Sequence, residues 1–192
     1  ATGYSAVVIT CEDVCVEDCR LLGGGLWVNL GGVLRQQRSM VGQTTVLRNT
    51  IVSNARGCGL LVTGRKSTPV VENCTFEQCQ LAGVAAQQEG NPTIAKCKLL
   101  NNIGYGARWW RMASGMIVKC DVNGSGSAGL YVSGHGTGPE VEANQFNNNL
   151  GIGLYVSGGA KGLYKGNVQQ NHPYCGFKVT KSCVEAVVVD NT

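Results

Sequence analysis

Apolar and polar residues recur along the chain with a period of about 23 to 24 residues, and such self-similarity at a fixed period is typical of repeat architectures. A glycine followed by an apolar residue marks each period. The marks are Gly59-Leu60, Gly83-Val84, Gly106-Ala107, Gly129-Leu130, Gly153-Leu154 and Gly176-Phe177. The step from one mark to the next varies by only one position, so the repeat is regular over most of the chain.

A second pattern fills the rest of each period. An apolar residue is followed three positions later by Cys or Asn, then by another apolar residue and by a small polar one. The sets are Val71, Cys74, Phe76, Cys79; Ile94, Cys97, Leu99, Asn102; Ile117, Cys120, Val122, Ser125; and Val141, Asn144, Phe146, Asn149. We extend the series upstream with Val16, Cys19, Leu21, Gly24 and with Val46, Asn49, Ile51, Asn54, and less regularly downstream with Asn167, Val168 and Asn171.

Alternation inside the short runs predicts strands with one buried face, as in Leu130 and Val132 or Leu154 and Val156. One coil cannot bury its apolar side chains alone, whereas coils stacked about 4.8 Å apart form continuous parallel sheets around a shared core. The pattern therefore predicts an all-β fold, a single-stranded right-handed parallel β-helix. This solenoid would be one domain spanning 1–192, with eight coils of about 23 to 24 residues.

Turn residues complete this prediction. We expect the repeated glycine to serve a turn that needs a positive φ angle. We expect asparagines in equivalent turns to hydrogen-bond from coil to coil, with ladders at Asn144 and Asn167 and at Asn149 and Asn171. One period is longer by roughly eleven residues, because Gly25-Leu26 and Gly59-Leu60 lie further apart than the other marks. We assign the excess to a protruding loop at 33–43 that carries Arg35, Arg38 and Met40.

Composition agrees with a turn-rich β protein, since the chain has 28 Gly and only 15% charged residues. It contains no apolar run long enough for a membrane span and no secretory signal at its start. The chain is expected to be soluble, either by itself or as a piece of a longer protein. A net charge of +4 spread over scattered Lys and Arg residues is weak support for nucleic-acid binding.

The ten cysteines are expected to be free thiols. Cys19, Cys74, Cys97 and Cys120 fall in the same predicted column as Asn49, Asn144 and Asn167, so they behave as small packing residues rather than as halves of disulfides. No C-x-x-C motif occurs, and no metal site or cofactor is predicted. Reduced thiols in this number indicate the cytoplasm or the nucleus.

The segments Asn91-Pro92-Thr93-Ile94-Ala95-Lys96-Cys97 and Gly138-Pro139-Glu140-Val141-Glu142-Ala143-Asn144 carry a family resemblance. Each is followed by asparagines and a Gly-apolar strand. They resemble right-handed β-helix repeats of the carbohydrate-binding and sugar-hydrolase class, most closely the β-helix of eukaryotic F-box substrate adaptors and related intracellular scaffolds. The resemblance covers about residues 16–179 and implies the fold. It leaves function open, because similar repeats serve lyases, epimerases and interaction modules.

No catalytic site is predicted. β-helix lyases resemble one another in a stacked acidic column, and the acidic pairs of this chain, such as Glu140 and Glu142, do not recur in adjacent coils. His135 and His172 fall in different turns, where we expect solvated side chains. The run from Gly134 to Gly138 lacks the Lys and the helix of a phosphate loop.

Side chains between the inward positions form an outward column that is a candidate binding face. It reads Trp27, Leu61, Ala85, Arg108, Tyr131, Tyr155 and Lys178. Trp110 occupies the flanking column, so we expect Trp110, Tyr131 and Tyr155 on one surface with Arg108, Arg111 and Lys178 at its edges. Alternation along the strand places Trp109 on the inside. Either small neighbouring residues make room for its ring there, or the register of the coil shifts and exposes it.

Three functions remain open: a non-enzymatic scaffold or adaptor for protein partners, a carbohydrate-binding or carbohydrate-modifying module, and an RNA-binding surface. The scaffold is preferred, and the outward aromatic column is its predicted anchor, although such residues also serve simply to cover a sheet. Both ends of the chain are apolar, at Val7-Val8-Ile9 and at Val187-Val188-Val189. We therefore expect the protein to act inside an assembly, in which the ends are covered by adjoining sequence of a longer protein or by self-association.

Overall fold

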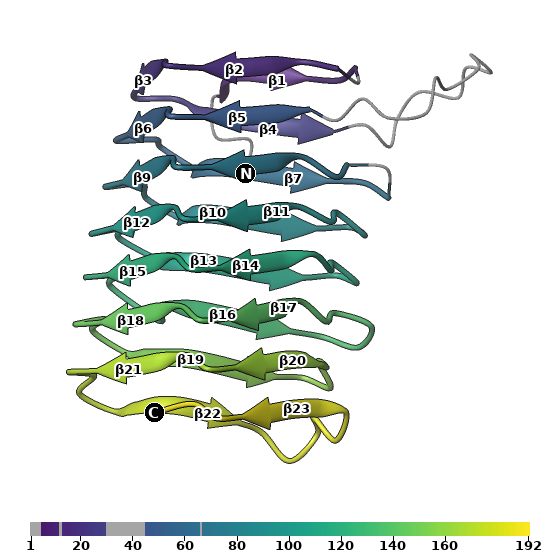
Figure 1. The fold of residues 1–192 in the computed structure, drawn as a ribbon, viewed down its shortest axis with the longest axis vertical. Coiled ribbons are helices and arrows are strands. Elements are labelled where there is room, and N and C mark those ends of the chain that lie inside the picture. Colours follow the sequence, from purple (N-terminus) through teal and green to yellow (C-terminus); the bar gives the residue numbers. More distant parts are fainter. Residues whose placement is uncertain (1–4, 12, 30–44, 66) are drawn as a thin grey trace.

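The protein is a stack of coils in which every strand pairs in parallel with the equivalent strand of the next coil. The computed structural model describes residues 5–11, 13–29, 45–65 and 67–192. These residues form three parallel sheets that run along the length of the stack (Figure 1). They contain no helix long and apolar enough to cross a membrane. The predicted parallel β-helix is confirmed.

Each coil contributes one strand to each sheet in turn. Sheet A runs through β1 (Ser5–Ile9), β4 (Gly25–Asn29), β7 (Cys58–Thr63), β10 (Ala82–Gln87), β13 (Tyr105–Trp110), β16 (Leu130–Ser133), β19 (Ile152–Ser157) and β22 (Cys175–Val179). Sheet B runs through β2 (Cys15–Glu17), β5 (Val46–Arg48), β8 (Val70–Glu72), β11 (Thr93–Ala95), β14 (Met116–Val118), β17 (Glu140–Glu142), β20 (Gly162–Lys165) and β23 (Ala186–Val189). Sheet C runs through β3 (Arg20–Leu22), β6 (Ile51–Ser53), β9 (Thr75–Glu77), β12 (Lys98–Leu100), β15 (Asp121–Asn123), β18 (Gln145–Asn147) and β21 (Val168–Gln170).

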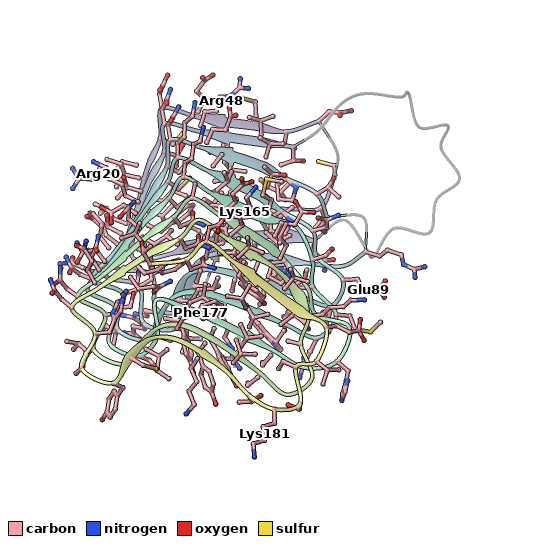
Figure 2. The ribbon with its side chains drawn as sticks, turned by 60° about the horizontal axis from the view of Figure 1, so that its bottom comes forward. Arg20, Arg48, Glu89, Lys165, Phe177 and Lys181 are labelled. Carbon is pink, nitrogen blue, oxygen red and sulfur yellow. The ribbon has the colours of Figure 1, made fainter. Side chains whose placement is uncertain are left out.

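The core lies between the three sheets and is made of columns of like residues. Leu60, Val84 and Ala107 follow one another in sheet A, and Phe76, Leu99 and Val122 follow one another in sheet C. All six are fully buried. Charged side chains such as Arg20, Arg48 and Lys181 lie at the outside of the stack (Figure 2). The period-2 alternation in the sequence therefore indicates which side chains point into the coil and which point out of it.

Asparagine ladders connect the coils on the inside, as predicted for Asn144 and Asn167. The Asn144 side-chain amide donates to Asn167 Oδ1 at 2.9 Å, and that of Asn167 donates to Asn191 Oδ1 at 2.8 Å. Each amide also donates to a backbone carbonyl of the preceding coil. The buried turn thereby pairs backbone groups that would otherwise be unsatisfied.

The predicted ladder between Asn149 and Asn171 is wrong. Asn171 donates to Asn148 Oδ1 at 3.1 Å on the outer surface of the turn. His172 occupies the coil position that follows Asn149, with its Nε2 3.0 Å from Phe146 O. His172 is therefore a half-buried member of the inner column rather than a solvated turn residue, whereas His135 is exposed as expected.

The predicted column of Val46, Asn49, Ile51 and Asn54 is displaced by one residue. Leu47 pairs with Val71 and Val52 pairs with Phe76, and both are fully buried. Thr50, not Asn49, therefore precedes Cys74 on the inside, while Asn49 and Asn54 are exposed at positive φ angles of 47° and 57°. Two adjacent apolar residues in each strand made both registers acceptable by pattern alone, and a one-residue shift exchanges the two faces.

The repeated glycine is required for a different reason than predicted. None of the six marking glycines has a positive φ angle. A Cβ atom added at Gly106 would lie 2.6 Å from the carbonyl oxygen of Gly129, and one added at Gly129 would lie 2.6 Å from that of Gly153. The column is glycine because the backbones of successive coils approach too closely for a side chain. Positive φ angles are instead adopted by polar turn residues such as Asn73, Lys96 and Lys119.

All ten cysteines are free thiols. Cys74, Cys97 and Cys120 follow one another in the inner column, where the Cys97 amide donates to Cys120 Sγ at 3.4 Å. The hydrogen bond to the Cys120 side chain, assisted by burial, raises the pKa of Cys97 to about 12. Burial raises the pKa of Cys58 to about 12 and that of Cys79 to about 11. Cys74, Cys97 and Cys120 act as apolar packing units, as the column analysis predicted, whereas Cys19 of the same predicted column is exposed.

Replacing Asn144 with Ala should lower the free energy of unfolding by about 2 to 4 kcal/mol, because Cys120 N, Ile117 O and Asn167 all lose a buried hydrogen-bond partner. Urea unfolding followed by circular dichroism measures the change. Asn148→Gly is the matched control, since it removes an amide from the exposed ladder and keeps the positive φ angle accessible. Equal losses in both variants would contradict a structural role for the inner ladder.

Thiol reactivity at pH 8 should separate the cysteines into classes. Cys11, Cys15 and Cys19 are exposed and should react rapidly with a disulfide reagent, whereas Cys79 and Cys97 should stay protected. Since the thiolate is the reacting species, a pKa near 12 leaves only about one molecule in ten thousand reactive. Peptide mapping after timed labelling measures each rate, and all ten cysteines should react once the protein is unfolded in guanidinium. Early labelling of Cys97 in the folded protein would contradict the buried column.

Candidate aromatic binding face

The outer surface of sheet A holds the predicted outward column in one continuous register. Arg108 pairs with Tyr131, Tyr131 with Tyr155, and Tyr155 with Lys178. Earlier in the same column, Trp27 pairs with Leu61 and Leu61 with Ala85. Ala85 is nonetheless fully buried. The accessible part of the column therefore divides into an N-terminal end and a C-terminal end.

Three tyrosines stack on one another along the solenoid axis. The rings of Tyr131 and Tyr155 have centroids 5.2 Å apart, and those of Tyr105 and Tyr131 lie 5.4 Å apart with an interplanar angle of 16°. Tyr131 thus has a ring on either side. Its hydroxyl accepts a hydrogen bond from Ser157 Oγ at 3.1 Å. We call Tyr105, Tyr131 and Tyr155 the tyrosine ladder.

Tyr105 is the member that alternation along the strand did not reveal. Strict alternation counted back from Arg108 would turn Tyr105 inward. The pairing of β10 with β13 keeps the same offset on both sides of Gly106, but Gly106 and Ala107 are both buried, so the alternation of inward and outward residues breaks at the glycine. The ring of Tyr105 therefore lies outside, against Tyr131. The repeated glycine is the only signal in the sequence, and it does not give the direction of the side chain.

Arg108 lies among aromatic rings without a charged partner. Its guanidinium carbon is 4.5 Å from the centroid of the Trp110 ring, 5.4 Å from that of Tyr105 and 5.8 Å from that of Tyr131. No described residue accepts a hydrogen bond from it, and its Nε atom is buried without a partner. The other predicted cation, Lys178, lies 5.4 Å from the centroid of Tyr155. Cations therefore flank the tyrosine ladder at both ends.

A groove of about 610 Å³ follows the ladder across β13, β16, β19 and β22. Its walls include the three ladder tyrosines, Ile152, Tyr174 and Lys178. Tyr174 is 80% exposed and extends the aromatic surface beyond the sheet. A shallow hollow with rigid amphipathic walls and a cationic rim is suited to binding part of another molecule.

Four of the predicted site residues do not line this groove: Trp27, Arg108, Trp110 and Arg111. Arg108 contacts the rings of Tyr105 and Tyr131 from outside the groove, with the Trp110 ring beside its guanidinium, whereas Trp27 and Arg111 lie elsewhere. Trp27 is four coil steps from Tyr131 in the column and donates from its indole nitrogen to Thr63 Oγ1 at 2.9 Å. Arg111 lies in the turn after β13 at a φ angle of 54° and lines a smaller hollow with Gln88, Glu89 and Met112. The structure thus brings together Arg108, Trp110, Tyr131, Tyr155 and Lys178.

Trp109 points into the core, which decides between the two predicted alternatives. It is fully buried, with Ala86 and Val132 as its partners in the adjacent strands. Its indole nitrogen donates to Ser114 O at 2.8 Å. Small neighbours make room for the ring, so adjacent tryptophans face opposite sides of the sheet and only Trp110 contributes to the outer face.

The described residues include no group of three or more His, Cys, Asp or Glu side chains placed to hold a metal ion. The predicted loop at 33–43, with Arg35, Arg38 and Met40, lies outside the described residues. No curated protein and no solved structure matches the chain. The profile of the family described as "Right handed beta helix region" matches residues 31–192, which is most of the chain. The protein therefore belongs to the right-handed β-helix family.

Proposed function

We propose that the protein is a non-enzymatic scaffold or adaptor whose tyrosine groove binds a protein partner within a larger assembly. The observation that carries the proposal is the ordered tyrosine ladder beside an accessible groove. Tyrosine combines a large apolar surface with a hydroxyl group and loses little conformational entropy on binding, so it is enriched in the energetic centres of protein interfaces.

The order of the ladder favours tight binding at little entropic cost. Tyr131 is held by Tyr105, by Tyr155 and by the Ser157 hydroxyl before any partner arrives. A side chain that is already immobilised need not be immobilised on association, and this saves roughly 0.5 to 1.5 kcal/mol per residue. The rigid sheet beneath it holds the same geometry in the free and bound states.

Ring geometry weighs against the two alternative functions, carbohydrate binding or modification and RNA binding. Bases stack on the open faces of aromatic rings, and sugar rings pack on the same faces. In the ladder, Tyr131 is stacked on both sides, and Lys178 lies over Tyr155. The ladder therefore presents mainly ring edges and hydroxyl groups to the groove. This arrangement suits a polypeptide, which offers both apolar side chains and hydrogen-bonding backbone groups.

Two further observations support an adaptor. The repeats resemble the β-helix of F-box substrate adaptors, and on this proposal the chain acts as such a module rather than as a sugar hydrolase or lyase. The ten free cysteines, several of them fully buried, support a reducing compartment, the cytoplasm or nucleus, as the place of action.

The proposal is tested by affinity capture with the protein and with a Tyr131→Ser, Tyr155→Ser double variant. We expect the variant to lose at least about nine tenths of a defined protein partner, because two anchors that each contribute about 1 to 2 kcal/mol are removed. Quantitative mass spectrometry of the captured material measures the loss, and thermal unfolding verifies that the variant is folded.

The matched control is a Met116→Ser, Leu163→Ser double variant on the outer face of sheet B. It removes comparable apolar surface and should leave capture unchanged. Equal capture by the protein and the tyrosine variant would contradict the proposed face. Recovery of RNA or glycan in place of a protein would support the corresponding alternative function.

A further inference from the structure

We propose that the tyrosine ladder and its groove recognise an extended acidic segment. One carboxylate is bound by Arg108, which packs on the ladder outside the groove lining, and a second is bound by Lys178 in the groove wall. This inference rests on the proposed function and names the chemistry of its partner. Three observations carry it: the missing counter-charge at Arg108, the edges that the ladder presents, and the spacing of the two cations.

Arg108 lacks the carboxylate that two other arginines of the solenoid find in the next coil, and its Nε atom is buried without a hydrogen-bond partner. Arg48 pairs with Glu72 at 3.1 Å and Arg65 pairs with Glu89 at 2.7 Å, each from one coil to the next. The neighbours of Arg108 in its column are Ala85 and Tyr131, which cannot form an ion pair. A guanidinium carries five donors, and none of those of Arg108 has an acceptor among the described residues. The aromatic rings nevertheless hold it in a defined position.

The ladder itself favours an anionic ligand. An aromatic ring is electron-rich on its faces and electropositive at its edge. The cations Arg108 and Lys178 take up ring faces, and tyrosine stacking takes up the others. The ladder therefore contributes electropositive ring edges and phenolic hydroxyl groups to the groove wall. No acidic side chain is among the described residues that line it.

The distance between the two cations determines how far apart the acidic residues of the bound segment must be. Arg108 and Lys178 are separated by three steps between paired strands, which is roughly 14 Å at about 4.8 Å per step. Along an extended chain, residues four positions apart are about 13 Å apart and point to the same side. Two acidic residues with three residues between them therefore match the two cations. The middle residue faces the ladder, where an apolar side chain fits the groove.

The experiment uses the full chain and fluorescein-labelled peptides in fluorescence anisotropy. The probe Thr-Asp-Thr-Leu-Thr-Asp-Thr has its carboxylates four residues apart, and its control Thr-Asp-Leu-Thr-Asp-Thr-Thr has the same composition with the carboxylates three apart. We expect the probe to bind at least about fivefold more tightly than the control, since only the probe can engage both cations from one side. Replacing both Asp residues with Asn should abolish binding.

Variants of the protein assign the effect to the two cations. Arg108→Gln and Lys178→Gln should each weaken binding of the probe by about tenfold, as expected for loss of a charge-assisted hydrogen bond. Arg108→Lys should fall between Arg108→Gln and the native protein, because it keeps the charge and loses the planar donor fork. Lys178 is exposed, so its variant is informative even if changes at Arg108 disturb the rings. Lys161→Gln, on a different outer face, is the control and should bind the probe normally.

Equal affinity for the two peptides, or unchanged affinity in both Gln variants, would overturn the inference. No binding at a peptide concentration of about 5 mM would also overturn it. Preferential binding of a uridine octanucleotide would overturn the inference and identify RNA, not an acidic segment, as the ligand. These outcomes are distinct from failure of the proposed function, because capture of a protein partner through Tyr131 and Tyr155 is measured independently of peptide charge.

Discussion

Parallel pairing of each coil with the next is the constraint on which the structure depends. Backbone hydrogen bonds fix the separation of the coils, so every side chain lies against the residue at the same position in the coil above and below. A residue type is tolerated only if it packs well against the residues at the same position in the neighbouring coils. The inner asparagines satisfy this with amide hydrogen bonds, the buried leucines and valines with apolar contact, and the glycine column by having no side chain at the closest approach.

The same constraint produces the candidate binding face. Tyrosines at equivalent positions on the outside of sheet A must stack, just as asparagines on the inside must hydrogen-bond. Stacking covers the faces of the ladder rings and leaves their edges and hydroxyl groups directed toward the groove. It also leaves Arg108 and Lys178 over the remaining faces, with Arg108 lacking an ionic partner among the described residues. The proposed preference for an anionic polypeptide rests on this arrangement of surface residues.

Departures from the repeat occur where neighbouring residues are chemically similar or where the backbone changes direction. Val46 and Leu47 are both apolar, and the choice between them is made by the paired strands β5 and β8. His172 replaces an asparagine because its ring nitrogens can also lie against backbone carbonyls of the preceding coil. At Gly106 two successive residues, Gly106 and Ala107, are buried, and this break in alternation leaves Tyr105 on the outer surface. Each case is a contact between coils, which a single strand does not contain.

The sequence by itself determined the β-helix, the coil length and the outward column from Arg108 to Lys178, because period and alternation are local properties that stacking preserves. It also determined that Cys74, Cys97 and Cys120 pack as free thiols in one column. Only the tertiary structure decided the register of Leu47, the reason for the glycine column, the direction of Tyr105 and the missing counter-charge at Arg108. Those features depend on what lies in the coil above and below, a full period of the repeat away along the chain.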